Sequence, residues 1–166
     1  KNKFSMGMAL ARVDTRYLTR KIESLNFVAS AKIVRNWWSD TLSIAIKTRV
    51  AIAQVGNSYI DREGVLFESS SIATSSLPIA TLSSADQAGT LTSFLTGIPQ
   101  TLKIASVDIS SDGIITSQDI SHRTVRWGDL TDLAVKLKVF TALTALPENK
   151  KALFFDLSTP DTPITK

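Results

Sequence analysis

The segment from Lys32 to Phe67 constrains the fold of this chain more than any other part of it. Its first half predicts two strands, Lys32–Asn36 and Thr41–Arg49, separated by a short turn. In the second strand, branched apolar side chains alternate with small or polar ones: Leu42, Ile44 and Ile46 against Ser43, Ala45 and Lys47. A polar hairpin follows at Ile60–Phe67. Alternation with a period of two is typical of strands that bury one face. The segment contains no pattern typical of catalysis, so we interpret it as a binding scaffold.

The length, composition and charge of the chain limit its domain number and the kinds of chemistry available to it. The 166 residues accommodate one ordinary domain or two small ones, and the apolar share of 43% is typical of globular proteins. Cysteine is absent, which excludes disulfides, thiolate catalysis and cysteine metal ligands. No apolar run of about 18 residues occurs, and Lys1–Ser5 shows no signal-peptide pattern. The formal charge of +4 is spread along the chain, which favours a solvated surface, with attraction to an anionic surface as the alternative.

The first half of the chain predicts a small α/β unit. Asp14 and Thr15 provide a helix start, and four apolar side chains follow on one face: Tyr17, Leu18, Ile22 and Leu25. The order helix, strand, strand and hairpin then completes a unit that ends near Phe67. The polar, serine-rich stretch from Glu68 to Ser76 predicts a linker or an exposed loop.

Two helices are predicted in the second half. The first begins at Ser83 or Ser84 and is stopped by Gly97 and Pro99. The second runs from about Asp129 to Ala145, with five apolar residues directed inward: Leu130, Leu133, Leu137, Phe140 and Leu143. Its polar residues are expected to point largely outward: Asp132, Lys136 and Lys138.

Strands are predicted at Leu102–Ile109, Ile114–Gln118 and His122–Trp127, with Leu153–Leu157 as the last one. Pro160 and Pro163 interrupt the tail that follows, and prolines in a strand-like segment indicate the edge of a sheet. An edge strand leaves backbone donors and acceptors available to another chain. The predicted fold class is therefore α+β, with a mixed sheet, two covering helices and a C-terminal edge strand.

The residues that could support chemistry have structural interpretations that we favour. The aspartates and the glycine of Asp108–Gly113 resemble part of a calcium-binding loop. Strand patterns and not helices flank this segment, so we predict a hairpin turn. Asp61–Gly64 is likewise predicted to be a turn rather than an acid pair. His122 is the only histidine, and no G-x-S-x-G, Walker or G-x-G-x-x-G motif accompanies it. We therefore predict no catalytic residue, no cofactor and no metal site.

The adjacent tryptophans Trp37 and Trp38 lie at the predicted strand turn, next to Arg35. They could stack on nucleic-acid bases, line a glycan site or anchor a partner. We expect instead that at least one ring covers the small core while the other is partly exposed.

Val34–Leu42 is similar to the turn V-R-x-x-W-P-D-T-L, and Ile60–Phe67 is similar to the hairpin V-D-x-x-G-x-x-F. Both motifs, in this order, resemble the FtsQ/DivIB family of bacterial cell-division proteins. The remaining matches are Leu10–Thr15 to P-L-x-x-V-D-T, Thr48–Ala53 to E-R-x-P-V-A, Leu77-Pro78 to L-P, Val125–Gly128 to V-x-L-G, Lys136-Leu137 to K-L, and Phe154–Lys166 to the closing I-D-V-S-x-P-x-x-P-V-T-R. The sequence departs from the pattern where Ser39 replaces the turn proline, Thr48 the glutamate and Ala51 the second proline.

The resemblance implies an extracytoplasmic region of two domains. Residues 1–67 would be a POTRA-like domain that lacks its first strand, and residues 68–166 a β domain. Such proteins are non-enzymatic septal scaffolds of the divisome, held in the cell membrane by a single N-terminal span that this chain does not include. They bind FtsB/DivIC-like and FtsL-like division proteins and connect them to septal wall synthesis, with no nucleic acid involved.

Together, the resemblance and the edge-strand pattern place the partner contacts on the tail. The predicted partner-binding residues are Leu157, Ser158, Thr159, Thr162, Ile164 and Lys166. The main alternative is a POTRA-type module of a secretion or outer-membrane assembly system. A hydrolase that uses His122 and a nucleic-acid binder are two further hypotheses, which predict loss of activity in His122→Ala and steeply salt-dependent affinity, respectively.

Overall fold

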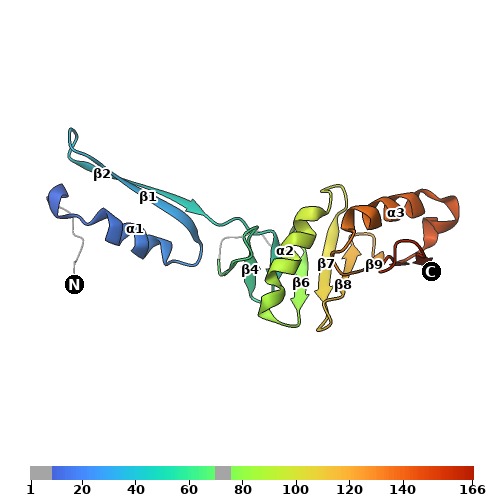
Figure 1. The fold of residues 1–166 in the computed structure, drawn as a ribbon. Coiled ribbons are helices and arrows are strands. Elements are labelled where there is room, and N and C mark those ends of the chain that lie inside the picture. Colours follow the sequence, from blue (N-terminus) through green and yellow to red (C-terminus); the bar gives the residue numbers. More distant parts are fainter. Residues whose placement is uncertain (1–8, 70–75) are drawn as a thin grey trace. The chain divides into compact units, whose positions relative to one another are not determined.

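The computed structural model describes residues 9–69 and 76–166, and it is an α+β protein of two compact units (Figure 1). Unit 1 comprises Lys1–Val50 and unit 2 comprises Ala51–Lys166. The predicted α+β class is confirmed. Each unit is described by itself below.

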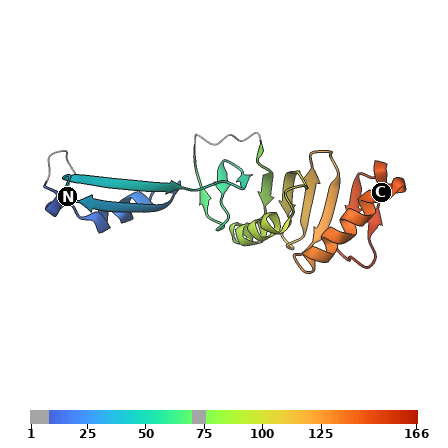
Figure 2. The same cartoon turned by 90° about the horizontal axis from the view of Figure 1, so that it is seen from above.

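Unit 1 is a long β-hairpin with one helix along one face (Figure 2). The hairpin consists of β1 (Val28–Asn36) and β2 (Thr41–Thr48), which pair antiparallel. The helix α1 (Thr15–Glu23) begins at Asp14, whose Oδ1 accepts a hydrogen bond from Tyr17 N–H at 3.0 Å. A short 3-10 helix, η1 (Leu10–Arg12), precedes it.

Few apolar side chains are buried in this unit. Among its described residues only Val13 and Val28 fall in the buried hydrophobic class. The expectation that a tryptophan ring covers the core is wrong, because Trp37 is 61% exposed and Trp38 is fully exposed. A two-stranded hairpin with one helix has too little surface to enclose its apolar face.

Unit 2 is built on a nine-stranded mixed sheet of order β11-β10-β9-β8-β7-β6-β3-β4-β5. The pairs β3–β6, β6–β7 and β9–β10 are parallel, and the remaining pairs are antiparallel. The strands are β3 (Ala53–Val55), β4 (Ser58–Ile60), β5 (Leu66–Phe67), β6 (Ile79–Leu82), β7 (Ile104–Ile109), β8 (Ile115–Asp119), β9 (Thr124–Gly128), β10 (Phe154–Asp156) and β11 (Ile164–Thr165).

Two helices cover one face of this sheet, α2 (Ala88–Gly97) and α3 (Leu133–Ala145) (Figures 1 and 2). The 3-10 helix η3 (Ala85–Gln87) leads into α2 from a capping box at Ser84, and η4 (Pro147–Lys151) follows α3. Aromatic rings link the layers: Phe94 lies 5.8 Å from Trp127, Trp127 lies 5.7 Å from Phe140, and Phe140 lies 5.3 Å from Phe155. The indole N–H of Trp127 donates to Ser117 Oγ at 2.8 Å, so the one polar group of this buried ring has a hydrogen-bond partner.

The boundary between the units lies at Val50/Ala51 and not after Phe67. The hairpin at Ile60–Phe67 belongs to the larger sheet, because β3 and β4 join it through parallel pairing of β3 with β6. Part of the predicted linker, residues 70–75, lies outside the described residues.

The prediction that Lys136 points outward is wrong. Its side chain is 2% exposed, and its Nζ donates to the backbone oxygen of Asp129 at 3.0 Å and to its Oδ1 at 3.1 Å. The hydrogen bond and charge of Lys136, with the hydrogen bonds from Thr131, lower the pKa of the exposed Asp129 carboxyl. The aliphatic stem of a lysine can enter a core when its ammonium group reaches acceptors at the rim.

Both predicted turns are confirmed. Gly113 N–H donates to Ser110 O at 2.9 Å between β7 and β8, and Gly113 has a positive φ of 76°. Gly64 N–H donates to Asp61 O at 3.1 Å between β4 and β5. The Asp61 carboxylate is buried and accepts from the backbone N–H groups of Glu63 and Val65, so its position is fixed by the turn.

Candidate partner-binding edge of the sheet

The C-terminal end of the chain forms one edge of the unit 2 sheet. The strand β10 lies beside β9 in parallel, with Phe155 opposite Val125. The chain then reverses, and β11 returns antiparallel to β10, with Thr165 opposite Phe155. In the described part of the chain, β11 is the last strand on this side of the sheet.

A tight reversal makes this return possible. Thr162 N–H donates to Thr159 O at 3.1 Å, which closes a four-residue turn with Pro160 at its second position. Ser158 passes close to Gly128, where an added Cβ would lie 3.1 Å from the Ser158 Cα. Because Gly128 also has a positive φ of 73°, the end of β9 needs glycine on both counts.

Hydrogen bonding between the two strands determines which backbone groups face outward. Phe154 N–H donates to Lys166 O at 3.1 Å, and Lys166 N–H donates to Phe154 O at 3.0 Å. Antiparallel strands alternate such hydrogen-bonded pairs with pairs that do not exchange bonds. Thr165 occupies the alternate position, so its N–H and C=O point away from β10. Pro163, two residues before Thr165, faces the same way, but it offers only a carbonyl because proline has no N–H.

The side chains at this edge divide between the two faces. Ile164 is 52% exposed and lies opposite Asp156, on the face away from the helices, because the neighbouring Phe155 is fully buried on the helix side. Thr165 points to the other face, where its hydroxyl hydrogen-bonds to Asn149 Oδ1 at 3.3 Å. A partner at this edge would therefore meet the apolar side chain of Ile164 beside the outward N–H and C=O groups of Thr165.

Asp156 is a charged neighbour of Ile164. Its carboxylate lies 3.7 Å from Arg126 Nη1 on β9. Burial alone would raise the pKa of Asp156, but the backbone and side-chain hydrogen bonds from Ser158 and the charge of Arg126 together lower it. Asp156 is consequently ionised and paired at neutral pH.

The structure separates the six predicted partner-binding residues into three groups. Ile164 and Lys166 lie at the edge strand, as expected for a contact surface, while Ser158, Thr159 and Thr162 lie in and beside the reversal, exposed. Leu157 does not fit the prediction: it is fully buried in the core, and its N–H donates to Arg126 O at 2.8 Å. The sequence analysis did not single out Thr165, because the outward direction of its N–H depends on the register with β10 and not on its side chain.

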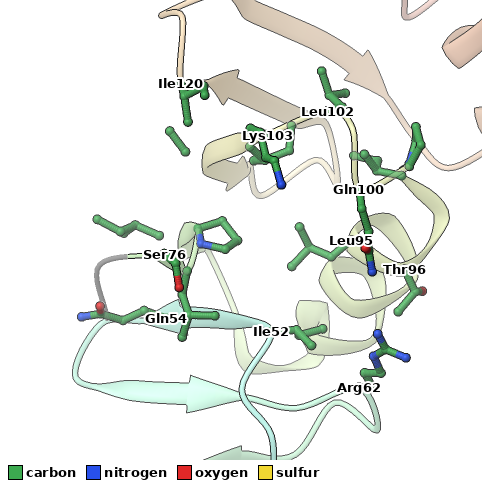
Figure 3. Close-up of a pocket in the computed structure, with 17 residues that line it drawn as sticks. Ile52, Gln54, Arg62, Ser76, Leu95, Thr96, Gln100, Leu102, Lys103 and Ile120 are labelled. Carbon is green, nitrogen blue, oxygen red and sulfur yellow. The ribbon is translucent and has the colours of Figure 1, made fainter. Parts of the chain in front are cut away.

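Unit 2 also contains a pocket of about 1000 Å³ near the start of β3, β6 and β7 (Figure 3). Its wall is largely apolar and includes Ile52, Leu95 and Leu102. Two cationic side chains, Arg62 and Lys103, belong to the lining, together with the amides of Gln54 and Gln100. The groups that this pocket offers to a ligand are thus amides and positive charges on an apolar wall.

His122 is the remaining candidate for chemistry. It is exposed in the turn between β8 and β9, with a positive φ of 62°, and its backbone N–H donates to Asp119 O. Asp119 is occupied by its own turn, because its carboxylate accepts from Ser121 N–H and from both the backbone and the side chain of Arg123. Across residues 9–69 and 76–166 no cluster of three metal-binding side chains is found, and no helix in those ranges has the length and hydropathy of a membrane span.

Comparison with known proteins does not identify a family. No protein-family model matches this sequence, and a search of curated proteins finds no match either.

Proposed function

We propose that this chain is the extracytoplasmic part of an FtsQ/DivIB-type cell-division protein. In this role it is a non-enzymatic septal scaffold that holds FtsB/DivIC-like and FtsL-like partners and connects them to septal wall synthesis. It is located at the division septum, on the outer side of the cell membrane.

The observation that carries the proposal is the outward edge of β11. A partner strand laid beside β11 can bond to Thr165 N–H and C=O and to Pro163 C=O. Strand addition obtains affinity from such main-chain bonds and selectivity from side chains at alternate positions. Ile164 and Lys166, which alternate with these outward-facing residues along β11, carry the exposed side chains.

The sequence resemblance supports the same conclusion. The segment similar to the V-R-x-x-W-P-D-T-L turn forms the β1–β2 turn, and the segment similar to V-x-L-G forms the end of β9. The glycine of the second motif is the one that Ser158 approaches closely. These positions are the ones expected for a member of that family.

A binding assay with point variants tests the proposal. The extracytoplasmic segment of an FtsB/DivIC-like protein is titrated with residues 1–166 and with Ile164→Asp, which places a carboxylate in the proposed interface. We expect the affinity to fall at least about tenfold, because an apolar contact is lost and a charge is buried. Ile120→Asp is the matched control, since Ile120 is equally apolar, 66% exposed and located after β8.

A second variant addresses the backbone. Thr165→Pro removes the outward N–H while the bonds between Phe154 and Lys166 stay in place, and proline is tolerated where the N–H faces solvent. We expect a loss of about twofold to tenfold, the value of one net hydrogen bond. Unchanged affinity in both variants, with unchanged melting, would contradict strand addition at this edge.

A further inference from the structure

The two units carry opposite net charges. Residues 1–50 contain ten lysines and arginines against three acidic residues, a formal charge of +7. Residues 51–166 contain nine basic and twelve acidic residues, a formal charge of −3. The mild total of +4 is therefore the sum of a strongly basic unit 1 and an acidic unit 2.

The tip of the β1–β2 hairpin presents two tryptophans in this basic unit. The carboxamide oxygen of Asn36 accepts from the backbone N–H of Trp38 at 3.1 Å, and the hydroxyls of Ser39 and Thr41 lie 2.8 Å apart. These bonds fix the turn, yet Trp38 is exposed to 101% of its reference area and Trp37 to 61%. An indole held fully in water by an ordered turn is an unusual placement for so large an apolar group.

Positive charges surround the same end of the hairpin. The Arg35 guanidinium lies 5.6 Å from the Trp37 ring centroid and donates to Val13 O, which brings η1 to the tip end of the hairpin. Arg12 in η1 and Arg16 in the first turn of α1 are both exposed. Two carboxylates are also near, Asp40 in the turn and the helix cap Asp14, so the cations remain in excess here.

We propose that unit 1 binds the surface of a bilayer rich in anionic lipids, with Trp37 and Trp38 entering the headgroup region. Tryptophan suits this depth because its ring is apolar and its N–H is polar. Each basic residue near an anionic leaflet adds to the attraction. The aromatic tip and the charges around it are thus the two components that a peripheral membrane contact requires.

The geometry favours a bilayer over a single-stranded nucleic acid. Nucleic acids stack on aromatic side chains that lie along a positively charged groove or sheet face. The uncovered face of β1 and β2 carries Lys32, Val34 and Ala45 but no aromatic residue. Both tryptophans lie at the end of the hairpin, where a bilayer can receive them end-on.

Vesicle binding by the full 166-residue chain tests this inference. Vesicles of phosphatidylcholine alone are compared with vesicles that contain phosphatidylglycerol, by co-sedimentation and by tryptophan quenching with brominated lipid. Trp127 is fully buried in unit 2 and serves as an internal reference that bromine should not reach. We expect binding to the anionic vesicles only, quenching of the exposed tryptophans, and weakening as salt rises.

Matched variants separate specific docking from general charge attraction. Trp38→Ala should lower vesicle affinity about tenfold, and Arg12→Glu with Arg16→Glu at least about tenfold. Lys150→Glu with Lys151→Glu makes the same change of net charge on exposed residues of η4 in unit 2 and should leave affinity nearly unchanged.

Three results would overturn the inference. One is equal binding to neutral and anionic vesicles, and another is an equal loss of affinity in the unit 1 and unit 2 charge variants. The third is tighter binding to single-stranded RNA than to anionic vesicles at the same salt, with the same dependence on Trp38. The inference does not depend on the proposed partner contact at β11, whose variants lie in the other unit.

Discussion

The two units differ most in how they treat their apolar side chains. Among the described residues, unit 2 has sixteen buried apolar residues, from Ala53 to Leu157, whereas unit 1 has two. In unit 1, Ile44 and Ile46 lie opposite Ile33 and Ala31 and yet remain 45% and 50% exposed. Unit 2 therefore has the core of an independent domain, while unit 1 exposes the surfaces through which it can make contacts.

Topology explains the difference. The helix α1 packs mainly on β1, so the apolar side chains of β2 lie beyond its reach. In unit 2 two helices cover one face of the sheet, and the ring series from Phe94 to Phe155 links the helices to the strands. The contrast shows that a strong alternating pattern predicts a strand but does not ensure that its apolar face is covered.

The largest expected effect concerns the core of unit 2. Phe94→Ala removes a fully buried ring that contacts Trp127. We expect the free energy of unfolding of unit 2 to fall by about 3–5 kcal/mol, because a cavity remains in a packed core. Trp127 fluorescence during urea unfolding reports the change. Leu153→Ala, at a 59% exposed position, should stay within about 0.5 kcal/mol, and equal costs would contradict the packed core.

A smaller effect is expected where unit 2 buries a charge. Lys136→Met keeps the aliphatic stem but removes the hydrogen bonds to Asp129. We expect a loss of about 1–3 kcal/mol, since the Asp129 carbonyl loses its charged donor. Lys138→Met on the exposed side of α3 is the matched control. If both variants unfold at the same urea concentration, the buried lysine contributes nothing.

The smallest expected effect is acid sensitivity, again confined to unit 2. The pKa values of Asp86, Asp129 and Asp156 lie below the ordinary aspartate value of 3.8 in the folded protein. Around that pH the unfolded chain binds more protons, so these groups stabilise the fold above about pH 4 and lose that contribution as pH falls through their folded pKa values.

Urea unfolding of unit 2 at a series of pH values between 2.5 and 6 measures this slope. Replacing Asp129 and Asp156 by asparagine should flatten it. A slope unaffected by both substitutions would mean that other groups control the acid transition.

Sequence reasoning succeeded where local patterns are long or carry turn residues. It predicted the β1–β2 hairpin from alternation and the end of α2 from Gly97 and Pro99. It missed β3 and β6, which are three and four residues long and too short for a periodic signal. Because the pairing of β3 with β6 draws the following hairpin into unit 2, missing these strands also displaced the predicted boundary.

The sequence predicted that the tail lies at the edge of the sheet, but it did not predict the register of the tail. Pro160 and Pro163 indicated an edge, yet the reversal at Thr159–Thr162 means that the tail folds back on β10 and does not extend it. Leu157 thus became a core residue, and Thr165 became the outward one. Such register information depends on contacts between distant segments, which no local pattern contains.

Amide hydrogen exchange of Thr165 tests the central claim most directly. The exchange rates of the chain are measured by NMR with and without the extracytoplasmic segment of an FtsB/DivIC-like protein. The account predicts that Thr165 N–H, which points away from β10, becomes protected at least about tenfold on binding, while the amides of β1 and β2 do not change. Unchanged exchange at Thr165, with protection appearing in the hairpin of unit 1 instead, would contradict it.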